Sequence, residues 1–147
     1  MVRAVLQRVD RASLKVDGKF VGKIERGIVA LICFVRGDGT KELDWLVSKI
    51  LNLRIFEDEQ GKMNLSVKDV GGKILAVSQF TLAADVKKGT RPSFSNAMNP
   101  DEARKMWDEF KLKISQEVEC VFGEFGAHME IELVNNGPVT IWLDRQF

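Results

Sequence analysis

Two continuous apolar stretches constrain the fold of this chain more than any other feature of its sequence. The first is GIVALICFV at residues 27–35, and the second is GGKILAVSQFTL at residues 71–82, whose last residues turn polar. Each apolar run is far shorter than the roughly 20 residues that a membrane-spanning helix needs. Short apolar runs of this kind are typical of strands buried inside a domain. We therefore expect both stretches to be central strands of a sheet.

Further strands are predicted on either side of this pair. VRAVLQRV at residues 2–9 has the composition of a strand. SLKVDGKFVGKI at residues 13–24 has the pattern of a hairpin, with Asp17-Gly18 as a tight two-residue turn. Residues 129–134 and 138–143 are predicted to be two more strands, with NNGP between them.

Two helices are predicted between the strands. The first places apolar side chains on one face at helical spacing: Leu43, Leu46, Val47, Ile50 and Leu51. The second starts with Asn99 as its N-cap, Pro100 at the first helical position and Glu102 placed for a capping box. Its apolar stripe, which we expect to lie in the core, consists of Ala103, Met106, Trp107, Phe110 and Ile114.

The length and the order of the elements indicate one domain over residues 1–147. Strands come first and then alternate with helices, which favours an α/β or α+β domain built on a mixed sheet. The formal net charge of +1 argues against a strongly basic nucleic-acid binder, although a few phosphate contacts remain compatible with it. The opening residues MVRAVLQRV lack the apolar core of a signal peptide, so we expect a cytoplasmic protein without a membrane partner.

Metal or cofactor binding is not expected from the residue inventory. The two cysteines, Cys33 and Cys120, both lie in apolar settings, and the chain has one histidine, His128. Structural zinc sites usually show closely paired ligands, which these three positions do not provide. We expect two buried free thiols and no metal site.

Three polar stretches are the candidates for chemistry. SQFTL offers Ser78, Gln79 and Thr81 at a strand end, where side chains either serve function or bond to the nearby backbone. A nucleophilic hydroxyl needs a base within reach, and the sequence places neither His128 nor a lysine beside it. The nearby KKGTR carries Lys87, Lys88 and Arg91, either as a solvated loop or as a grip for phosphate.

The third stretch, NNGPVT at residues 135–140, holds the adjacent pair Gly137-Pro138. Proline cannot donate to a sheet ladder, so the pair either opens a strand or shapes a turn. A Gly-Pro bond can also be cis at a cost of about 0.5–1 kcal/mol. These residues alone leave open whether the pair has a function.

In this order, the motifs resemble those of the D-aminoacyl-tRNA deacylases, which proofread translation. The resemblance rests on QRV, GKMNLS, VSQFTLAAD, RPSFS and VNNGPVTIW, and it spans nearly the whole chain. The SQFTL and NxGPVT signatures are both intact, and the variable position of the second is Asn136, where many relatives carry Asp. The family hydrolyses the ester that joins a D-amino acid, or achiral glycine, to the terminal adenosine of tRNA.

The resemblance implies a homodimer with a β/β/α layered fold and no cofactor. It also implies a cis Gly137-Pro138 peptide that reaches into the partner's site and rejects L-amino acids by steric clash. Arg8 would brace this loop through backbone carbonyl. Substrate would be bound by Asn135, Gly137, Pro138, Val139 and Thr140, with Arg8 behind them. The catalytic residues would be Ser78, Gln79, Phe80 and Thr81. The tRNA phosphates would be bound by Lys87, Lys88 and Arg91.

Within this interpretation, the amide groups near Phe80 and Thr81 would hold the ester oxygen, and a ribose hydroxyl of the substrate would replace the missing base. Thr81 as a covalent nucleophile stays an alternative. Other hypotheses are a Ser/Thr esterase of small molecules, a tRNA-end binder without catalysis, and an editing module of a synthetase.

Overall fold

The computed structural model describes every residue from Met1 to Phe147. The strands are β1 (Val2–Val16), β2 (Lys19–Ile24), β3 (Gly27–Cys33), β4 (Phe56–Glu57), β5 (Met63–Leu65), β6 (Lys73–Ser78), β7 (Cys120–Phe122) and β8 (Met129–Arg145). The helices are α1 (Thr40–Asn52), the 3₁₀ helix η1 (Phe80–Ala83) and α2 (Pro100–Ser115). None of them combines the length and the apolar character that crossing a membrane would require.

The main sheet is mixed, as expected, and has the order β2-β1-β3-β6-β7. The two buried apolar runs form its centre, because β3 and β6 pair in parallel and β7 continues parallel to β6. β1 is long enough to change partners: residues 3–9 pair with β3, and residues 12–16 pair with β2. β8 runs antiparallel along β1 through both of these halves.

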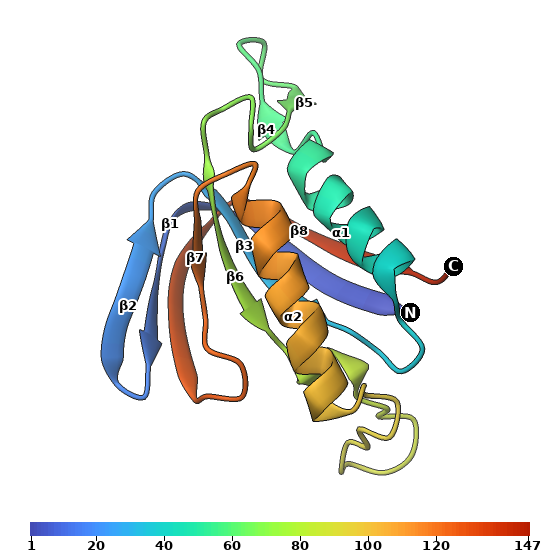
Figure 1. The fold of residues 1–147 in the computed structure, drawn as a ribbon. Helices are drawn as coiled ribbons and strands as arrows, with labels where there is room; N and C mark the ends of the chain where they lie inside the picture. Colours follow the sequence, from blue (N-terminus) through green and yellow to red (C-terminus); the bar gives the residue numbers. More distant parts are fainter.

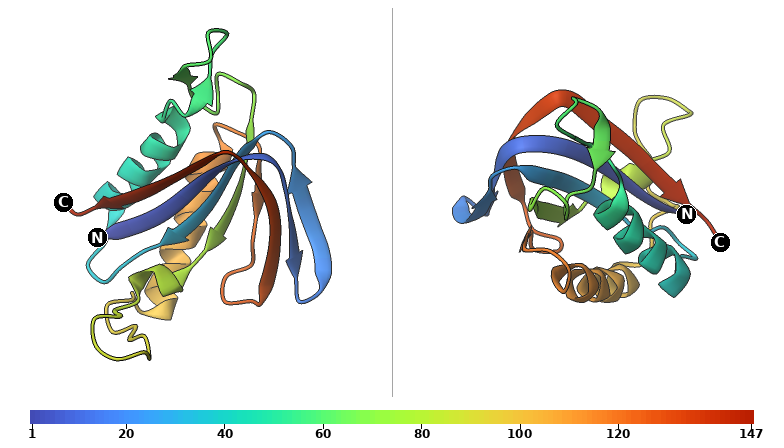
Figure 2. Two further views of the ribbon diagram at one scale, coloured as in Figure 1. Left: turned by 180° about the vertical axis from the view of Figure 1, so that it is seen from behind. Right: turned by 90° about the horizontal axis from the view of Figure 1, so that it is seen from above.

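The layers follow from the alternation of side chains along the central strands. Ile28 and Ile74 point to one face, where α1 and α2 cover them with residues such as Trp107 (Figures 1 and 2). Val29 and Leu75 point to the opposite face, since successive strand residues alternate. There they pack in a second core with residues of β2 and of the later half of β1, including Leu14 and Ile24. The β/β/α arrangement of a single domain is thus confirmed.

Two predicted strand boundaries were wrong, because β1 and β8 pair with each other along nearly their whole length. The strand predicted at residues 2–9 continues without a break to Val16, and residues 129–134 and 138–143 belong to the single strand β8. NNGP therefore does not connect two strands that pair with each other. Both parts of β8 pair with β1, and the polar residues between them bulge out of that ladder.

The helix caps agree in part with the prediction. Asn99 caps α2 by accepting a hydrogen bond from the Asp101 amide at 2.9 Å, and Pro100 occupies the first helical position. Glu102 does not return a hydrogen bond to the Asn99 amide, so the expected capping box was wrong. A reciprocal side-chain bond of that kind occurs at α1, where the Gly39 amide donates to Glu42 at 3.2 Å.

Gly27 marks a close approach between β3 and β6 that admits no side chain. A Cβ at this position would lie 1.9 Å from the Lys73 carbonyl oxygen, which belongs to the backbone and cannot rotate away. We expect Gly27→Ala to lower the free energy of unfolding by about 2–4 kcal/mol in urea titrations. The control is Gly39→Ala, whose Cβ would meet nothing within 4 Å and should cost less than about 1 kcal/mol. Equal losses in the two variants would contradict this account.

Candidate functional site

The SQFTL segment lies where β6 leaves the sheet. The Gln79 amide donates to the Ile32 carbonyl at 2.7 Å, which extends the pairing with β3 by one residue. The chain then turns into η1, whose end is held by Arg3, because its Nη1 donates to the Leu82 carbonyl at 2.7 Å. The segment is therefore fixed on both sides while its middle faces outward.

The side chains of this segment are accessible but lack an activating base. Phe80 is 59% exposed and contacts Phe94 edge to face, with ring centroids 5.1 Å apart. Gln79 Nε2 donates to the exposed Thr81 hydroxyl, so the Thr81 oxygen is an acceptor in this arrangement. The hydroxyl of the half-buried Ser78 makes no hydrogen bond within the chain. His128 lies at the β1–β2 turn, where its carbonyl accepts from the Asp17 amide at 3.0 Å.

Cys33 is a further nucleophilic side chain close to the SQFTL segment. Its Sγ lies 3.7 Å from the Phe80 carbonyl oxygen, and the residue is buried. Burial raises the pKa of the Cys33 thiol to about 11, so it is protonated near neutral pH. A protonated and buried thiol is a poor nucleophile, and Cys33 therefore has a packing role.

The Gly-Pro segment occupies the interruption of the β1–β8 ladder. Gln7 pairs with Thr140 and Val9 pairs with Asn135, so four residues of β8 stand opposite Arg8 alone. The Gly137-Pro138 bond is cis, and Gly137 has a φ of 126°, in the region that favours glycine. Gly137 and Pro138 are both exposed.

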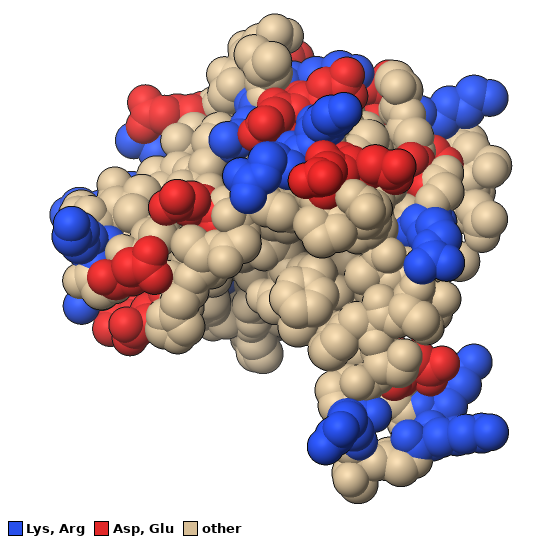
Figure 3. All heavy atoms as spheres, turned by 60° about the horizontal axis from the view of Figure 1, so that its bottom comes forward, with Lys and Arg blue, Asp and Glu red and all other residues tan.

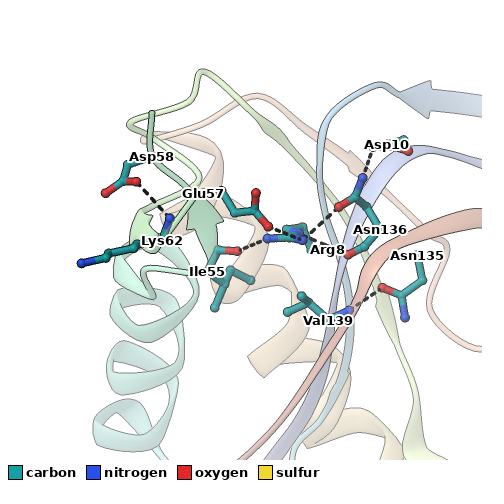
Figure 4. A network of polar contacts seen from close by, with 9 residues as sticks. All are labelled: Arg8, Asp10, Ile55, Glu57, Asp58, Lys62, Asn135, Asn136 and Val139. Atoms are coloured by element: carbon teal, nitrogen blue, oxygen red, sulfur yellow. Dashed lines mark hydrogen bonds and ion pairs between the residues drawn. The ribbon is translucent and has the colours of Figure 1, made fainter. Parts of the chain in front are cut away.

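Arg8 holds this segment from behind (Figure 4). Its Nε donates to the Asn136 carbonyl at 3.2 Å, and its Nη2 donates to Asn136 Oδ1 at 2.9 Å. Its Nη1 donates to the Ile55 carbonyl at 2.8 Å, and Glu57 lies 3.7 Å from Nη2. The guanidinium is almost fully buried, and a buried charge of this kind needs such partners. We call Arg8 together with the two oxygens of Asn136 the Arg8 fork.

The flanks of the Gly-Pro segment are fixed by a second set of polar contacts. The Val139 amide donates to Asn135 Oδ1 at 3.1 Å, and Asn135 Nδ2 donates to Thr140 Oγ1 at 3.0 Å. Gln7 Nε2 approaches the same Thr140 oxygen at 3.5 Å. Val139 is buried, so the segment is anchored on both sides of its exposed tip.

The two motifs do not meet within one chain. Arg8, which marks the Gly-Pro segment, stands level with Ile28 and Ile74, four residues before Ser78. Four residues along a strand span about 13 Å, and the three strand spacings between β8 and β6 span about 14 Å. The SQFTL segment and the Gly-Pro tip of the same chain are thus about 20 Å apart along the sheet.

The predicted phosphate grip lies on a loop that projects between η1 and α2. Asp85 and Ser93 close this loop through two backbone hydrogen bonds, at 2.7 and 2.9 Å. Lys87, Lys88 and Arg91 lie between them, and all three are exposed. Figure 3 shows cationic side chains gathered on this projecting part of the surface. The three cations form no ion pair within the chain and are free to meet an anionic ligand.

The sequence pattern missed several residues of this site. Ile55, Glu57 and Asn136 surround Arg8. Asp10 accepts a hydrogen bond from Asn136, and Arg3 holds η1. Asp10 and Glu57 are charged residues in polar stretches, and Ile55 contributes only its carbonyl group. No periodicity distinguishes such residues, because their role depends on which strands become neighbours.

Comparisons with known proteins bear on the chain as a whole. The model of a family described as D-Tyr-tRNA(Tyr) deacylase matches residues 5–144. A D-aminoacyl-tRNA deacylase of Kosmotoga olearia is 54% identical over 145 residues, which cover 99% of this chain and 98% of the relative. A D-aminoacyl-tRNA deacylase of Magnetococcus marinus is 52% identical over 145 residues and covers 97% and 96% of the two chains.

Two solved structures share the fold. A protein described as c-Myc DNA Unwinding Element Binding Protein superimposes with a TM-score of 0.93 at 43% identity, over 99% of both chains. A probable eukaryotic D-amino acid tRNA deacylase superimposes with a TM-score of 0.84 over 98% of this chain and 99% of that one. Its identity is 21%, so this second likeness concerns the fold alone.

The geometry of the Arg8 fork predicts that lysine cannot replace Arg8. A single ammonium group cannot reach both oxygens of Asn136 and the Ile55 carbonyl at once. We expect Arg8→Lys to lower the free energy of unfolding by about 2 kcal/mol, the scale of hydrogen bonds to a charged group. Arg11→Lys is the matched control, because the Arg11 side chain is exposed and makes no hydrogen bond or ion pair. The account is wrong if urea unfolding shows no larger loss for Arg8→Lys than for Arg11→Lys.

Proposed function

The chain belongs to the D-Tyr-tRNA(Tyr) deacylase family and is a hydrolase of the aminoacyl-tRNA ester bond, and from this premise we propose how it selects D-aminoacyl substrates. The SQFTL segment of one chain binds and cleaves the ester. The Gly137-Pro138 tip of a second chain completes the pocket and excludes L-aminoacyl groups. Glycyl-tRNA, which has no side chain to exclude, is a further substrate.

The observation that carries this proposal is the separation of the two motifs within one chain. Each motif is anchored by its own hydrogen bonds and exposed at its tip, yet about 20 Å of sheet lies between them. A pocket that uses both motifs therefore needs a second copy. A twofold symmetric dimer supplies this arrangement twice, since each chain gives its tip to the other.

An uncovered part of the sheet offers a surface for that second copy. Val5 pairs with Trp142 across the β1–β8 ladder, on the side opposite Ala4 and Leu143, which face the helices. Trp142 is 50% exposed in the isolated chain. Large exposed aromatic side chains are enriched in the centres of protein interfaces. We assign this face to the homodimer contact.

Selection against L-amino acids follows from the backbone of the tip. Gly137 has no Cβ, so backbone carbonyl oxygens can approach the α-carbon of the substrate closely. A D-aminoacyl group presents its α-hydrogen to these oxygens, whereas an L-aminoacyl group presents its side chain. The tip contacts no part of a D side chain, so one pocket accepts many D-amino acids.

The chemistry rests on the SQFTL segment and on the substrate. The first amide groups of η1, at Phe80 and Thr81, have no acceptor inside the helix and can stabilise the ester oxygen as it becomes negative. Gln79 holds this geometry through its hydrogen bond to Thr81, and Ser78 through its strand pairing with Ile32. A neighbouring ribose hydroxyl positions or activates the attacking water. Phosphates of the tRNA near the pocket are contacted by Lys87, Lys88 and Arg91. Three such contacts are compatible with a chain whose net charge is only +1. The enzyme acts in the cytoplasm.

Two assays test this function. Matched D- and L-aminoacyl-tRNA, with glycyl-tRNA beside them, should show rapid hydrolysis of the D and glycyl esters only. A tRNA-end binder without catalysis would hydrolyse none of them, and a small-molecule esterase would not need the tRNA.

Subunit mixing tests the shared pocket. Because the tip also completes the pocket around D-aminoacyl substrates, a chain with Pro138→Ala should have low activity alone, and so should a chain with Phe80→Ala. After unfolding and refolding together, about a quarter of wild-type activity should return, since half of the dimers then carry one intact pocket. No recovery would place both motifs in one chain's pocket and contradict the proposal. Size-exclusion chromatography is the control, and it should show that both variants still dimerise.

Thr81 lacks the partners of an activated nucleophile. Its hydroxyl accepts a hydrogen bond from Gln79 and has no base beside it, so it is not expected to attack the ester. Thr81→Ala should lower kcat by less than about tenfold, the scale of one lost hydrogen bond. Single-turnover rates on D-aminoacyl-tRNA measure this. A loss of about 10⁴–10⁶ in a folded variant would instead support covalent catalysis by Thr81.

The ribose hydroxyl next to the ester is the proposed source of general-base help. D-aminoacyl-tRNA ending in 2′-deoxyadenosine should bind as well as the normal substrate but react about 10²–10⁴ times more slowly, the usual contribution of a general base. Single-turnover rates at saturating enzyme compare the two substrates. Equal rates would show that the protein provides the base itself, with Thr81, Lys87, Lys88 and His128 as the candidates.

A further inference from the structure

The Arg8 fork depends on which way the Asn136 side-chain amide is turned, and this amide can rotate more freely than the other groups of the fork. Asn136 Oδ1 must face Arg8, because a guanidinium only donates hydrogen bonds. An asparagine amide, however, has an oxygen on one side and an NH₂ group of nearly equal size on the other. A half-turn of the amide would place its NH₂ group against the N–H groups of Arg8 and break the hydrogen bond between Arg8 Nη2 and Asn136 Oδ1.

Packing does not prevent that half-turn. A cavity of about 190 Å³ opens beside the amide, and its walls include Arg8, Asp10, Glu57 and Asn136. Asn136 itself is exposed. The choice between the two orientations must therefore come from hydrogen bonding.

Asp10 adds a second hydrogen bond that favours the orientation Arg8 requires. Its Oδ1 accepts from Asn136 Nδ2 at 2.8 Å (Figure 4). A carboxylate only accepts, so Asp10 bonds the NH₂ side of the amide and repels the oxygen side. Asp10 reaches this place because β1 has one unpaired residue there, between Val9, opposite Asn135, and Arg11, opposite Val134. The ladder thus puts an acceptor on one side of Asn136 and a donor on the other.

We propose that Asp10 is a positioning residue that sets substrate selectivity by holding the Asn136 amide with its oxygen toward Arg8. The inference rests on the proposed function, in which the Gly137-Pro138 tip excludes L-aminoacyl groups. Asn136 directly precedes Gly137, and its backbone carbonyl accepts the other hydrogen bond of the Arg8 fork, from Arg8 Nε. When the amide turns over, the tip loses part of its anchor, and L-aminoacyl groups pass more easily.

This role predicts a specific pattern among substitutions. Asp10→Ala removes the acceptor and should lower the ratio of D- to L-aminoacyl hydrolysis by about three- to tenfold. Asp10→Asn removes the charge but keeps an oxygen that accepts from Asn136, so its ratio should stay within about twofold of wild type. Asn136→Asp added to Asp10→Ala should restore the ratio, because a carboxylate offers an oxygen to Arg8 in either orientation.

The experiment measures single-turnover rates on matched D- and L-aminoacyl-tRNA for the wild type and the three variants. Glu132→Ala is the control, since Glu132 is an exposed β8 carboxylate without a partner, and it should leave the ratio unchanged. Thermal unfolding of each variant separates selectivity from stability, because a general loss of stability lowers both rates together.

Three outcomes would overturn the inference: an unchanged ratio in Asp10→Ala, a loss in Asp10→Asn equal to that in Asp10→Ala, or no recovery in the double variant. The second outcome would show that Asp10 acts only through its charge. A wild-type enzyme that hydrolyses D and L esters equally would refute the proposed function itself, which keeps the two failures distinct.

Discussion

The buried guanidinium of Arg8 lies at the point on which the rest of the architecture depends. The longest ladder of the sheet, β1 with β8, is interrupted there, and beyond it β1 exchanges β3 for β2 as its neighbour. A buried charge left without partners would cost several kcal/mol. Arg8 avoids this cost by bonding the Asn136 and Ile55 oxygens, and it thereby ties the Gly-Pro segment to the β4 region.

The same interruption links the fold to the proposed reaction. A regular ladder would have paired residues 136–139 and hidden their backbone, whereas the bulge exposes Gly137 and Pro138 while Val139 stays buried. An exposed backbone segment that is fixed at both ends can exclude a substrate by steric clash. It rejects the substrate's side chain on the wrong side of the α-carbon and needs no pocket that fits one particular amino acid. The SQFTL segment has the same design, because hydrogen bonds at Gln79 and Leu82 fix a turn whose middle is open.

Electrostatics has a limited part in the proposed tRNA contact and in the chemistry. The cations of the loop between η1 and α2 are exposed and belong to a nearly neutral chain, so their contribution to tRNA affinity should weaken as salt rises. Neither the buried Cys33 nor the unassisted Thr81 offers an activated nucleophile. In the proposed mechanism the protein therefore contributes mainly shape and positioned amide groups, and the substrate's ribose supplies the general base.

The sequence by itself determined the local features of this protein. The apolar runs of β3 and β6, the Asp17-Gly18 turn and the apolar faces of both helices were predicted correctly, because each depends on neighbours along the chain. The SQFTL and NNGPVT stretches were also recognised from the sequence as candidate functional motifs. Only the tertiary structure decided that β8 is one strand and that the motifs lie about 20 Å apart. It also decided that Asp10 and Ile55 meet around Arg8 and Asn136. These features depend on strand register and on a bulge, and residues more than a hundred positions apart set both, beyond the reach of any local pattern.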